Sequence, residues 1–304
     1  MEQYAVFIGE PCVDEYYQVL GQWPNEGEKF LTKYDHQNTG GMIANASCVM
    51  AGYGEKTYCL CSLFKDNEYD FLMHELNVMH VDPSYIVTLD EGRNGKCLIY
   101  SLEDGERNIN VIASDEKPLL NHEDYLDLLE NASFIYTSPS QIQMFKEPKE
   151  LLKHLHNKGV RIAFDCESSC YRKDWKDFIQ YATYVSMNDY AIEIYGEGKK
   201  ADVVSKEVLD LGVNIFVETL GSKGSHIYTK EKDFIIEPYP TNVVDTTGAG
   251  DTYNSSFVYG LIKDWDIEKA GHFATAAASL AIQKKGARSG TNDVNTVLKF
   301  MEEN

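Results

Sequence analysis

The sequence predicts an α/β fold: a three-layer α/β/α core on a mostly parallel central sheet, with a small separate β-sheet. Two observations indicate this class. Beyond residue 121, short apolar segments alternate with helical ones, as in βαβ units whose sheet is covered on both faces. Two strand pairs, at 12–38 and 95–112, fall outside that alternation, and we interpret them as a lid. Ordinary edge strands of the main sheet are the alternative. We expect one domain, 1–304, with this lid as its subdomain.

The first part of the chain is expected to be rich in strands. An apolar run that ends in glycine, 4–9, indicates a buried strand. Strands are then expected at 15–22 and 28–38 around a turn at 23–27, followed by a helix from Gly40-Gly41 to about Gly52. From 56 to 113 strands resume around a helix at 66–79, and a turn at 103–106 joins strands 96–102 and 107–112.

The remainder follows the strand–helix alternation. Strands are predicted at 132–138, 160–165, 183–187 and 213–219, and helices at about 143–157, 171–180 and 201–211. A helix at 251–263 comes next, and an alanine-rich helix occupies 270–281. Because small side chains allow close approach, we expect this last helix to pack against the one that begins at Asp251.

The segment 245–251 carries the most specific chemistry. It reads Asp-Thr-Thr-Gly-Ala-Gly-Asp and leads directly into the helix at 251–263. Its glycines allow backbone N–H groups to converge on one point, where the positive end of the helix dipole also favours an anion. Asp251 lies beside that point and can accept a proton from an attacking hydroxyl. An anion-binding turn with an adjacent carboxylate base is the minimum equipment for phosphoryl transfer to an alcohol.

Other interpretations of these residues explain less. A glycine-rich helix cap accounts for Gly248 and Gly250 but not for the aspartates on both sides. A dinucleotide-binding turn needs a third glycine where the chain has Tyr253. An aspartic protease needs two Asp-Thr-Thr-Gly loops that share a proton, and the sequence has only one.

The net charge of the chain limits the classes of molecule that it can bind. The formal net charge of −20 disfavours nucleic acids and anionic membranes, because the field of the protein repels phosphate polymers. Binding of an anionic nucleotide must therefore depend on oriented backbone amides, a divalent metal and nearby cationic side chains. The candidate cations are Lys223, Lys284, Lys285 and Arg288.

The cysteines and the lengths of the apolar segments indicate the cellular compartment. Seven cysteines show no disulfide spacing, and Cys166 and Cys170 have no second ligand pair, which disfavours a zinc site. No stretch reaches the ~18 apolar residues of a membrane span, and the first residues do not form a signal peptide. We expect a cytoplasmic protein with reduced thiols.

The segment 244–253 resembles the C-terminal signature of the ribokinase-like (PfkB) carbohydrate kinases. The resemblance extends over essentially the whole chain. Residues 9–14 are similar to the family's first strand, which ends in a sugar-binding aspartate. Residues 40–45 are similar to its Gly-Gly motif with a following asparagine, and 219–224 resemble a loop that lines the nucleotide site. For 219–224 an ordinary hairpin turn is an equally good interpretation.

The resemblance implies a role for each matching residue. The implied roles are catalysis for Gly248, Ala249, Gly250 and Asp251; sugar binding for Asp14, Gly40, Gly41 and Asn45; nucleotide binding for Asn188, Thr219, Gly221, Lys223 and Gly224; and, in members that use one, a monovalent cation for Asp245, Thr247 and Gly286. The implied cofactors are ATP and Mg²⁺, with K⁺ as a further candidate.

The chain departs from the family pattern at several positions. The family's Asn-x-x-Glu, whose glutamate helps organise magnesium, is Asn188-Asp189-Tyr190-Ala191, so Asp189 is the expected stand-in. The Gly-Asp-Asp-x-x-Gly pattern is reduced to 64–67, and a serine near the cation loop is Gly290. These losses leave the fold unaffected but bear on metal geometry and specificity.

The sequence therefore predicts an ATP- and magnesium-dependent kinase that phosphorylates a hydroxymethyl group of a sugar or sugar derivative. A nucleoside kinase on the same fold is the nearest alternative, with Tyr16, Tyr17 and Phe30 as candidates for a base-binding slot. A catalytically idle sugar-binding member is the other alternative. Exposed apolar lid residues such as Trp23 and Phe30 also predict a homodimer through the lid.

Overall fold

A nine-stranded sheet forms the centre of the molecule. The computed structural model describes residues 3–102 and 107–304. The strand order is β13-β12-β11-β10-β9-β8-β1-β4-β5. All neighbours from β11 to β5 pair in parallel, whereas β12 and β13 are antiparallel additions at one edge. The strands are β1 (Tyr4–Ile8), β4 (Lys56–Phe64), β5 (Asp82–Leu89), β8 (Phe134–Thr137), β9 (Ile162–Asp165), β10 (Tyr184–Asn188), β11 (Ile215–Thr219), β12 (Ser225–Thr229) and β13 (Asp233–Ile236).

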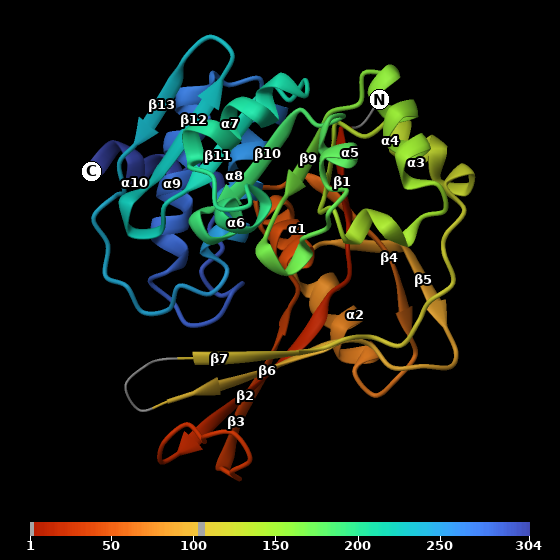
Figure 1. Ribbon diagram of the computed structural model, residues 1–304, viewed down its shortest axis with the longest axis vertical. Helices are drawn as coiled ribbons and strands as arrows, with labels where there is room; N and C mark the ends of the chain where they lie inside the picture. The colour runs from red at the N-terminus through yellow and green to blue at the C-terminus, as the bar shows by residue number, and fades with distance from the viewer. Residues whose placement is uncertain (1–2, 103–106) are drawn as a thin grey trace.

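Helices cover both faces of this sheet (Figure 1). One core cluster joins the sheet to α1 (Met42–Gly52), α8 (Ala249–Ile262), α9 (Ile267–Ala281) and α10 (Val294–Glu303). The opposite cluster joins it to α3 (Leu126–Glu130), α4 (Pro148–Asn157), α5 (Lys176–Ile179), α6 (Asp189–Tyr195) and α7 (Ala201–Asp210). The helix α2 (Tyr69–Val78) packs on a third cluster beside β4. The predicted three-layer α/β/α core with a mostly parallel sheet is confirmed.

A separate four-stranded sheet projects from this body (Figure 1). Its order is β3-β2-β6-β7, from β2 (Cys12–Leu20), β3 (Leu31–Gly40), β6 (Lys96–Ser101) and β7 (Arg107–Ile112). The strands β2 and β6 are parallel, and the other neighbours are antiparallel. The strand pairs at 12–38 and 95–112 thus form a small sheet of their own and not edge strands of the main sheet. The predicted turn at 103–106 lies outside the described residues.

The alanine-rich helix packs closely on α8, as its composition predicts. A Cβ added to Gly260 of α8 would lie 2.8 Å from the Cβ of Ala270 in α9. Larger side chains at either position would push the two helices apart. This packing fixes the direction of α8, whose first residues carry the candidate chemistry.

Several elements differ from the expected ones. The helix expected at 171–180 is a single turn, α5, and the helix expected at 143–157 begins at Pro148, whose missing N–H suits a first turn. The helix α6 was not predicted, although Asn188 is a good N-cap residue and its side chain accepts a hydrogen bond from the Ala191 N–H. The C-terminal helix α10, capped by Asp293, and the β12–β13 hairpin were also missed.

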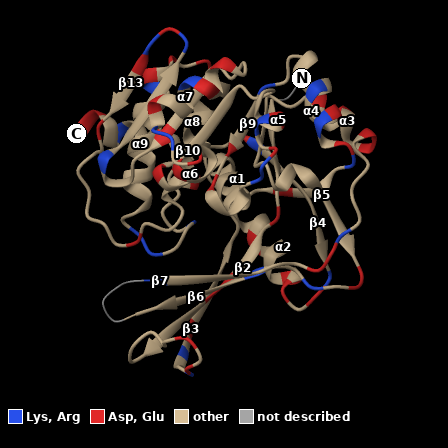
Figure 2. Ribbon diagram, viewed as in Figure 1, with Lys and Arg blue, Asp and Glu red and all other residues tan. Residues whose placement is uncertain are grey.

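Charged side chains are spread over the surface. Figure 2 shows Asp and Glu residues scattered over helices and connecting loops, with Lys and Arg residues between them. Within the described ranges, none of the helices combines the length and the apolar character needed to cross a membrane.

Candidate active site

One cleft of about 920 Å³ collects most of the polar residues discussed above. It lies between the small sheet and the carboxyl ends of the parallel strands. Parallel strands all end at one edge of their sheet, so the residues that follow them converge there. Asp165, Asn188 and Thr219, which end β9, β10 and β11, line it together with residues of β2, β6, β7 and the α8 N-terminus. The predicted site residues among the lining are Asp14, Gly41, Asn188, Thr219, Thr247, Gly250 and Asp251.

The N-terminus of α8 presents backbone donors to this cleft. Gly248 has a φ of 78°, and a Cβ there would lie 2.6 Å from the Ala287 carbonyl oxygen, so only glycine fits. The Ala249 N–H donates to the Thr246 carbonyl at 3.2 Å. The N–H groups of Gly250 and Asp251 have no acceptor within the described part of the chain. Because Ala249 closes the turn, the backbone donors that remain at this helix end are the Gly250 and Asp251 N–H groups.

Asp251 lies at the floor of the cleft and is held by a relay of side chains. Its Oδ2 accepts a hydrogen bond of 2.8 Å from the Asn45 Nδ2, and the Arg288 Nε donates to the Asn45 Oδ1 at 2.8 Å. Arg288 thereby orients the Asn45 amide so that its NH₂ group points at Asp251. Burial, followed by the negative charge of Asp165, raises the pKa of Asp251 to about 8, although the Asn45 hydrogen bond opposes the shift.

Arg288 lies at the small sheet and not at the nucleotide end, where the sequence analysis placed it. Its Nη1 donates to the Thr39 Oγ1 at 2.6 Å and its Nη2 to the Gly40 carbonyl at 2.9 Å. These bonds tie the end of β3 to the body. The other expected cations are exposed and do not line the cleft: Lys223, Lys284 and Lys285.

Asp14 forms the opposite end of the cleft, on β2. Its side chain is buried, and burial raises the pKa of its carboxyl group. A Cβ on Gly40 would overlap the Asp14 carboxylate, and Gly41, with a φ of 94°, would place a Cβ 2.6 Å from the Glu10 carbonyl. Gly40 therefore lets the backbone approach Asp14 closely, and Gly41 lets it approach the backbone that leads into β2. Gly40 and Asn45 do not line the cleft; they position residues that do.

Asp165 was missed by the sequence analysis. It accepts hydrogen bonds from the Tyr136 hydroxyl at 2.7 Å and the Asn254 amide at 2.9 Å, and Tyr184 donates to the Asn254 amide oxygen at 2.8 Å. Burial raises the pKa of Asp165 to about 6 despite these bonds. Its position at the carboxyl end of the predicted strand 160–165 was the signal available in the sequence.

The residue that replaces the family glutamate does not face the cleft. Ala191 is fully buried and belongs to the core cluster beneath α6. Asp189, the expected stand-in, is exposed, does not line the cleft, and accepts a hydrogen bond from the Tyr190 N–H at 2.9 Å. The Asn188 cap turns position 191 toward the sheet, so Ala191 lies away from the cleft. Glu167 does line the cleft, as Asp165 and Asn188 do.

The loop at 219–224 connects β11 to β12 as a hairpin. Thr219 lines the cleft, whereas Gly221 and Lys223 lie beyond its wall and are exposed. Gly224 has a φ of 83°, and a Cβ there would overlap the Ile236 carbonyl of β13. Gly224 is therefore required by the hairpin itself, whatever binds nearby.

Asp245, Thr247 and Gly286 are brought together, and an arginine joins them. The Asp245 carboxylate accepts hydrogen bonds from the Thr247 and Gly286 N–H groups, both at 2.9 Å. Arg107 of β7 donates to Asp245 at 3.2 Å and to the Thr247 Oγ1 at 2.7 Å. Burial raises the pKa of Asp245, but the hydrogen bonds and the Arg107 charge outweigh burial, so the pKa is lowered. Arg107 thus places a positive charge, and one end of the small sheet, against the anion-binding turn.

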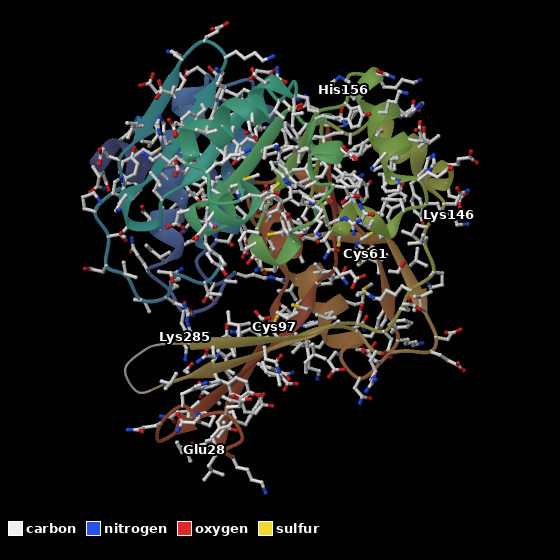
Figure 3. The ribbon with its side chains drawn as sticks, in the orientation of Figure 1. Glu28, Cys61, Cys97, Lys146, His156 and Lys285 are labelled. Carbon is white, nitrogen blue, oxygen red and sulfur yellow. The ribbon has the colours of Figure 1, made fainter. Side chains whose placement is uncertain are left out.

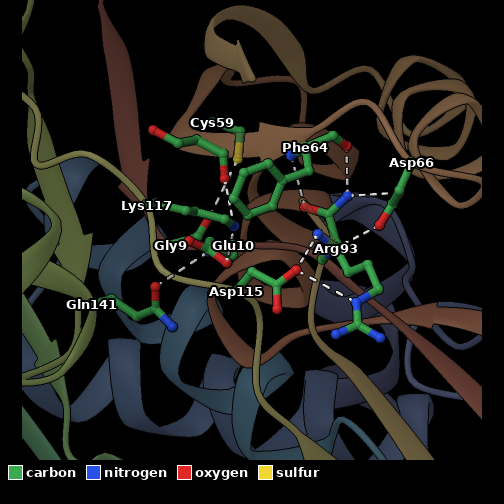
Figure 4. A network of polar contacts seen from close by, with 11 residues as sticks. Gly9, Glu10, Cys59, Phe64, Asp66, Arg93, Asp115, Lys117 and Gln141 are labelled. Carbon is green, nitrogen blue, oxygen red and sulfur yellow. Dashed lines mark hydrogen bonds and ion pairs between the residues drawn. The ribbon is translucent and has the colours of Figure 1, made fainter. Parts of the chain in front are cut away.

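The degraded pattern at 64–67 has a structural role (Figure 4). Asp66 accepts hydrogen bonds from the Asn94 N–H at 2.6 Å and its amide at 2.8 Å, and the Asn94 amide also pairs with the Phe64 backbone. Lys117 lies over the Phe64 ring and donates to Glu10 at 2.7 Å. These contacts hold the chain where it enters β6 and where it leaves β1.

A helix N-terminus aimed into a cleft at the carboxyl edge of a parallel sheet, beside a carboxylate, is suited to bind a phosphoryl group in an α/β enzyme. The chain belongs to the pfkB family of carbohydrate kinases, whose family model matches residues 2–294. It is 25% identical over 328 aligned positions to a 5-dehydro-2-deoxygluconokinase of Geobacillus kaustophilus, covering 98% of this chain and 93% of the relative.

Two solved structures share the fold. A ribokinase from Arabidopsis thaliana, complexed with ribose and ATP, superimposes with a TM-score of 0.84 at 24% identity, over 99% of both chains. A nucleoside kinase from Methanocaldococcus jannaschii superimposes with a TM-score of 0.81 at 22% identity, over 100% of this chain and 99% of the other. Because both likenesses are that distant in sequence, they establish the fold and leave the acceptor open.

Proposed function

We propose that this carbohydrate kinase transfers the γ-phosphoryl group of ATP to a hydroxymethyl group of a sugar or sugar derivative, with Asp251 as the general base. The observation that carries the proposal is the position of Asp251. Its carboxylate lies in the cleft at the N-terminus of α8, held by Asn45 and next to two backbone N–H groups without a partner within residues 107–304 or 3–102.

The reaction would use the chain's own groups as follows. Asp14 accepts hydrogen bonds from acceptor hydroxyls, with the Gly41 backbone against the ring. Asp251 takes the proton of the attacking hydroxyl, whose oxygen forms a bond to the γ-phosphorus as the bond to the β-phosphate oxygen breaks and ADP leaves. The Gly250 and Asp251 N–H groups stabilise the charge on the transferring phosphoryl group. A Cβ on Gly250 would meet nothing within 4 Å, which leaves room for that group.

The cleft has oxygen ligands that suit a magnesium ion accompanying the nucleotide. Asp165 and Glu167 are carboxylates that line it, and Mg²⁺ binds through one or two carboxylates together with phosphate oxygens and water. The ion would neutralise phosphate charge in a protein whose net charge is −20. We expect Glu167→Gln to raise the magnesium concentration for half-maximal rate, and Asp189→Asn to leave it unchanged. The opposite result would return the role to Asp189.

The cleft favours a sugar over a nucleoside. Of the aromatic residues suggested for a base slot, Tyr16 stacks on His36, and Tyr17 and Phe30 contact Tyr100; none of the three lines the cleft. Beside Asp14, on the same face of the small sheet, the lining is aliphatic, with Ile99, Ile109 and Val111. A nucleoside base would lack an aromatic partner at that end of the cleft.

The proposal is tested by measuring ADP release across sugars, sugar amines, sugar acids and nucleosides. We expect a sugar or sugar derivative to give the highest rate, and Asp251→Asn to lower that rate by about 100- to 10,000-fold with nucleotide affinity retained. If nucleosides react fastest, the nucleoside kinase alternative holds. If no acceptor reacts but sugars bind, the idle-member alternative holds.

We further propose that a monovalent cation and the Arg107 guanidinium are alternatives at Asp245. Both are positive, and Arg107 occupies the Asp245 carboxylate in this arrangement. A potassium requirement is therefore expected only where the small sheet moves away from the turn. Turnover measured with K⁺ replaced by tetramethylammonium tests this: equal rates contradict any role for K⁺.

We also propose that the small sheet closes over the acceptor and pairs two subunits. Its outer face carries a continuous aromatic cluster: Tyr17, Trp23, Phe30, Tyr34 and Tyr100. Trp23 and Phe30 are 41% and 39% exposed, a large apolar surface for a lone chain.

A further inference from the structure

Three side chains of the small sheet converge at the acceptor end of the cleft. Cys12 and Asp14 are two residues apart on β2 and so share a face, and Cys97 on β6 is aligned with Asp14 in the strand register. The Cys12 and Cys97 sulfur atoms are 4.0 Å apart, and the Cys12 sulfur is 3.5 Å from the Asp14 Oδ1. All three residues line the cleft, and Figure 3 shows Cys97 where the small sheet meets the body.

These separations match the edges of a tetrahedral metal site. Zn²⁺ binds sulfur at about 2.3 Å and oxygen at about 2.0 Å, which separates two sulfur ligands by about 3.8 Å and a sulfur from an oxygen by about 3.5 Å. One ligand atom from each residue lies within 4.8 Å of the others. Only small side-chain rotations are needed to bring all three atoms onto one ion.

We propose that Cys12, Cys97 and Asp14 form a three-ligand Zn²⁺ site whose fourth position opens into the cleft. Two thiolates and a carboxylate carry a charge of −3, which Zn²⁺ and the nearby Arg288 guanidinium neutralise together. Binding transfers the two thiol protons to solvent as two Zn–S bonds form. The sequence gives no signal for this site, because its cysteines are 85 residues apart and share no ligand-spacing motif.

Zinc at this site would compete with the acceptor. This consequence depends on the proposed function, in which Asp14 binds acceptor hydroxyls, because a bound ion takes the Asp14 oxygen. Zn²⁺ is then expected to raise the KM for the acceptor while the KM for ATP stays constant. The metal site itself is tested without substrate, so the failure of either proposal is separable from failure of the other.

The test is metal binding by the full chain without nucleotide, which would itself chelate the ion. Equilibrium dialysis with Zn²⁺, and titration with Co²⁺ followed by thiolate-to-cobalt absorption, should both give one ion per chain. Cys12→Ser and Cys97→Ser should each weaken Zn²⁺ binding by more than about 100-fold, since loss of even an outer-sphere partner costs 10–100-fold. Cys170→Ser is the matched control: this cysteine also lines the cleft but lies outside the cluster, so its variant should bind normally.

Alkylation of the wild-type protein provides a readout independent of variant folding. Zn²⁺ should protect Cys12 and Cys97 from iodoacetamide, as mapped by mass spectrometry, and leave the labelling of Cys170 unchanged. The proposal is overturned if no ion binds, if both serine variants bind as tightly as the wild type, or if Zn²⁺ protects neither cysteine.

Discussion

Asp251 owes its chemistry to burial. A carboxylate at the floor of a cleft loses hydration, and the neighbouring Asp165 adds a like charge; together they raise the pKa of Asp251 to about 8. A base with that pKa is matched to the proton of an attacking hydroxyl near neutral pH. The helix N-terminus alone would have favoured the charged form, so burial is the larger effect here.

The pH dependence of catalysis follows from that pKa. The base acts in its ionised form, so kcat/KM for the acceptor should rise about tenfold per pH unit below about pH 8 and level off above it. Profiles measured from pH 5 to 10 check this. An acidic limb that levels off near pH 4 would show that Asp251 is ionised throughout and contradict the assignment.

The same shift predicts how stability varies with pH. Asp251 binds its proton more tightly in the folded protein, where its pKa is about 8, than in the unfolded chain, where the pKa of an aspartate is about 3.9. The stability that it contributes is therefore fully present below about pH 4 and is lost as the pH rises through about 8. Asp251→Asn cannot ionise. Chemical denaturation should show a flatter pH dependence for Asp251→Asn than for the wild type, and equal slopes would indicate an unshifted pKa.

In the proposed function, acceptor recognition depends on Asp14. Its removal should raise the KM for the acceptor by about 100-fold or more, because a buried partner of a substrate hydroxyl discriminates strongly, while the KM for ATP changes little. Steady-state kinetics of Asp14→Ala check this, with Asp82→Ala at the far edge strand β5 as a control that should behave like the wild type. A change in the KM for ATP alone would place Asp14 at the nucleotide.

At the scale of elements, Arg107 and Arg288 both connect the small sheet to the body. Arg107 at the start of β7 reaches Asp245 and Thr247 beside the anion turn, while Arg288 ties β3 from the other side. The network around Asp66 and Asn94 holds the opposite end of β6. Loss of the Arg107 contacts would therefore release the start of β7 from the body, while the contacts of Arg288 and Asp66 remain.

We expect acceptor binding to slow hydrogen exchange in β2, β3, β6 and β7, because phosphoryl transfer must exclude water. Arg107→Ala should abolish part of this protection and increase ATP hydrolysis without acceptor phosphorylation. Hydrogen-exchange mass spectrometry and the ratio of ADP to phosphorylated product measure the two effects. Arg93→Ala, which removes an exposed contact to Asp115, is the control. Exchange that is insensitive to acceptor would contradict closure.

Elements were predictable where their signal is local. The strands from β8 to β11 were predicted to within a few residues, since buried parallel strands are short apolar runs. The orientation of Ala191 was not predicted, because it depends on the Asn188 cap and on which side of α6 meets the sheet. The one-turn α5 also escaped prediction: helical periodicity predicts a helix from residue 171, but residues 171–175 are not helical and α5 covers only Lys176–Ile179.

At the scale of the whole molecule, the aromatic outer face of the small sheet predicts self-association. Burial of Trp23, Phe30 and their neighbours in a second copy would remove a large apolar surface from water. Sedimentation velocity at micromolar concentration should show a dimer for the wild type and a monomer for Trp23→Glu combined with Phe30→Glu. Val203→Glu, on the body helix α7 and similarly exposed at 43%, should remain dimeric. A monomeric wild type would contradict the interface.

The sequence by itself determined the parallel α/β core, the small sheet and the glycine turn before α8. Each of these depends on residues that are neighbours along the chain: alternating apolar runs, strand pairs around turns, and glycines at a helix N-terminus. The roles of Asn45 and Arg288 toward Asp251, the placement of Arg107 against Asp245, and the meeting of Cys12 with Cys97 were decided only by the tertiary structure. The physical reason is that strand register and helix packing, which act over hundreds of residues, set which side chains share a cleft and how much water reaches them.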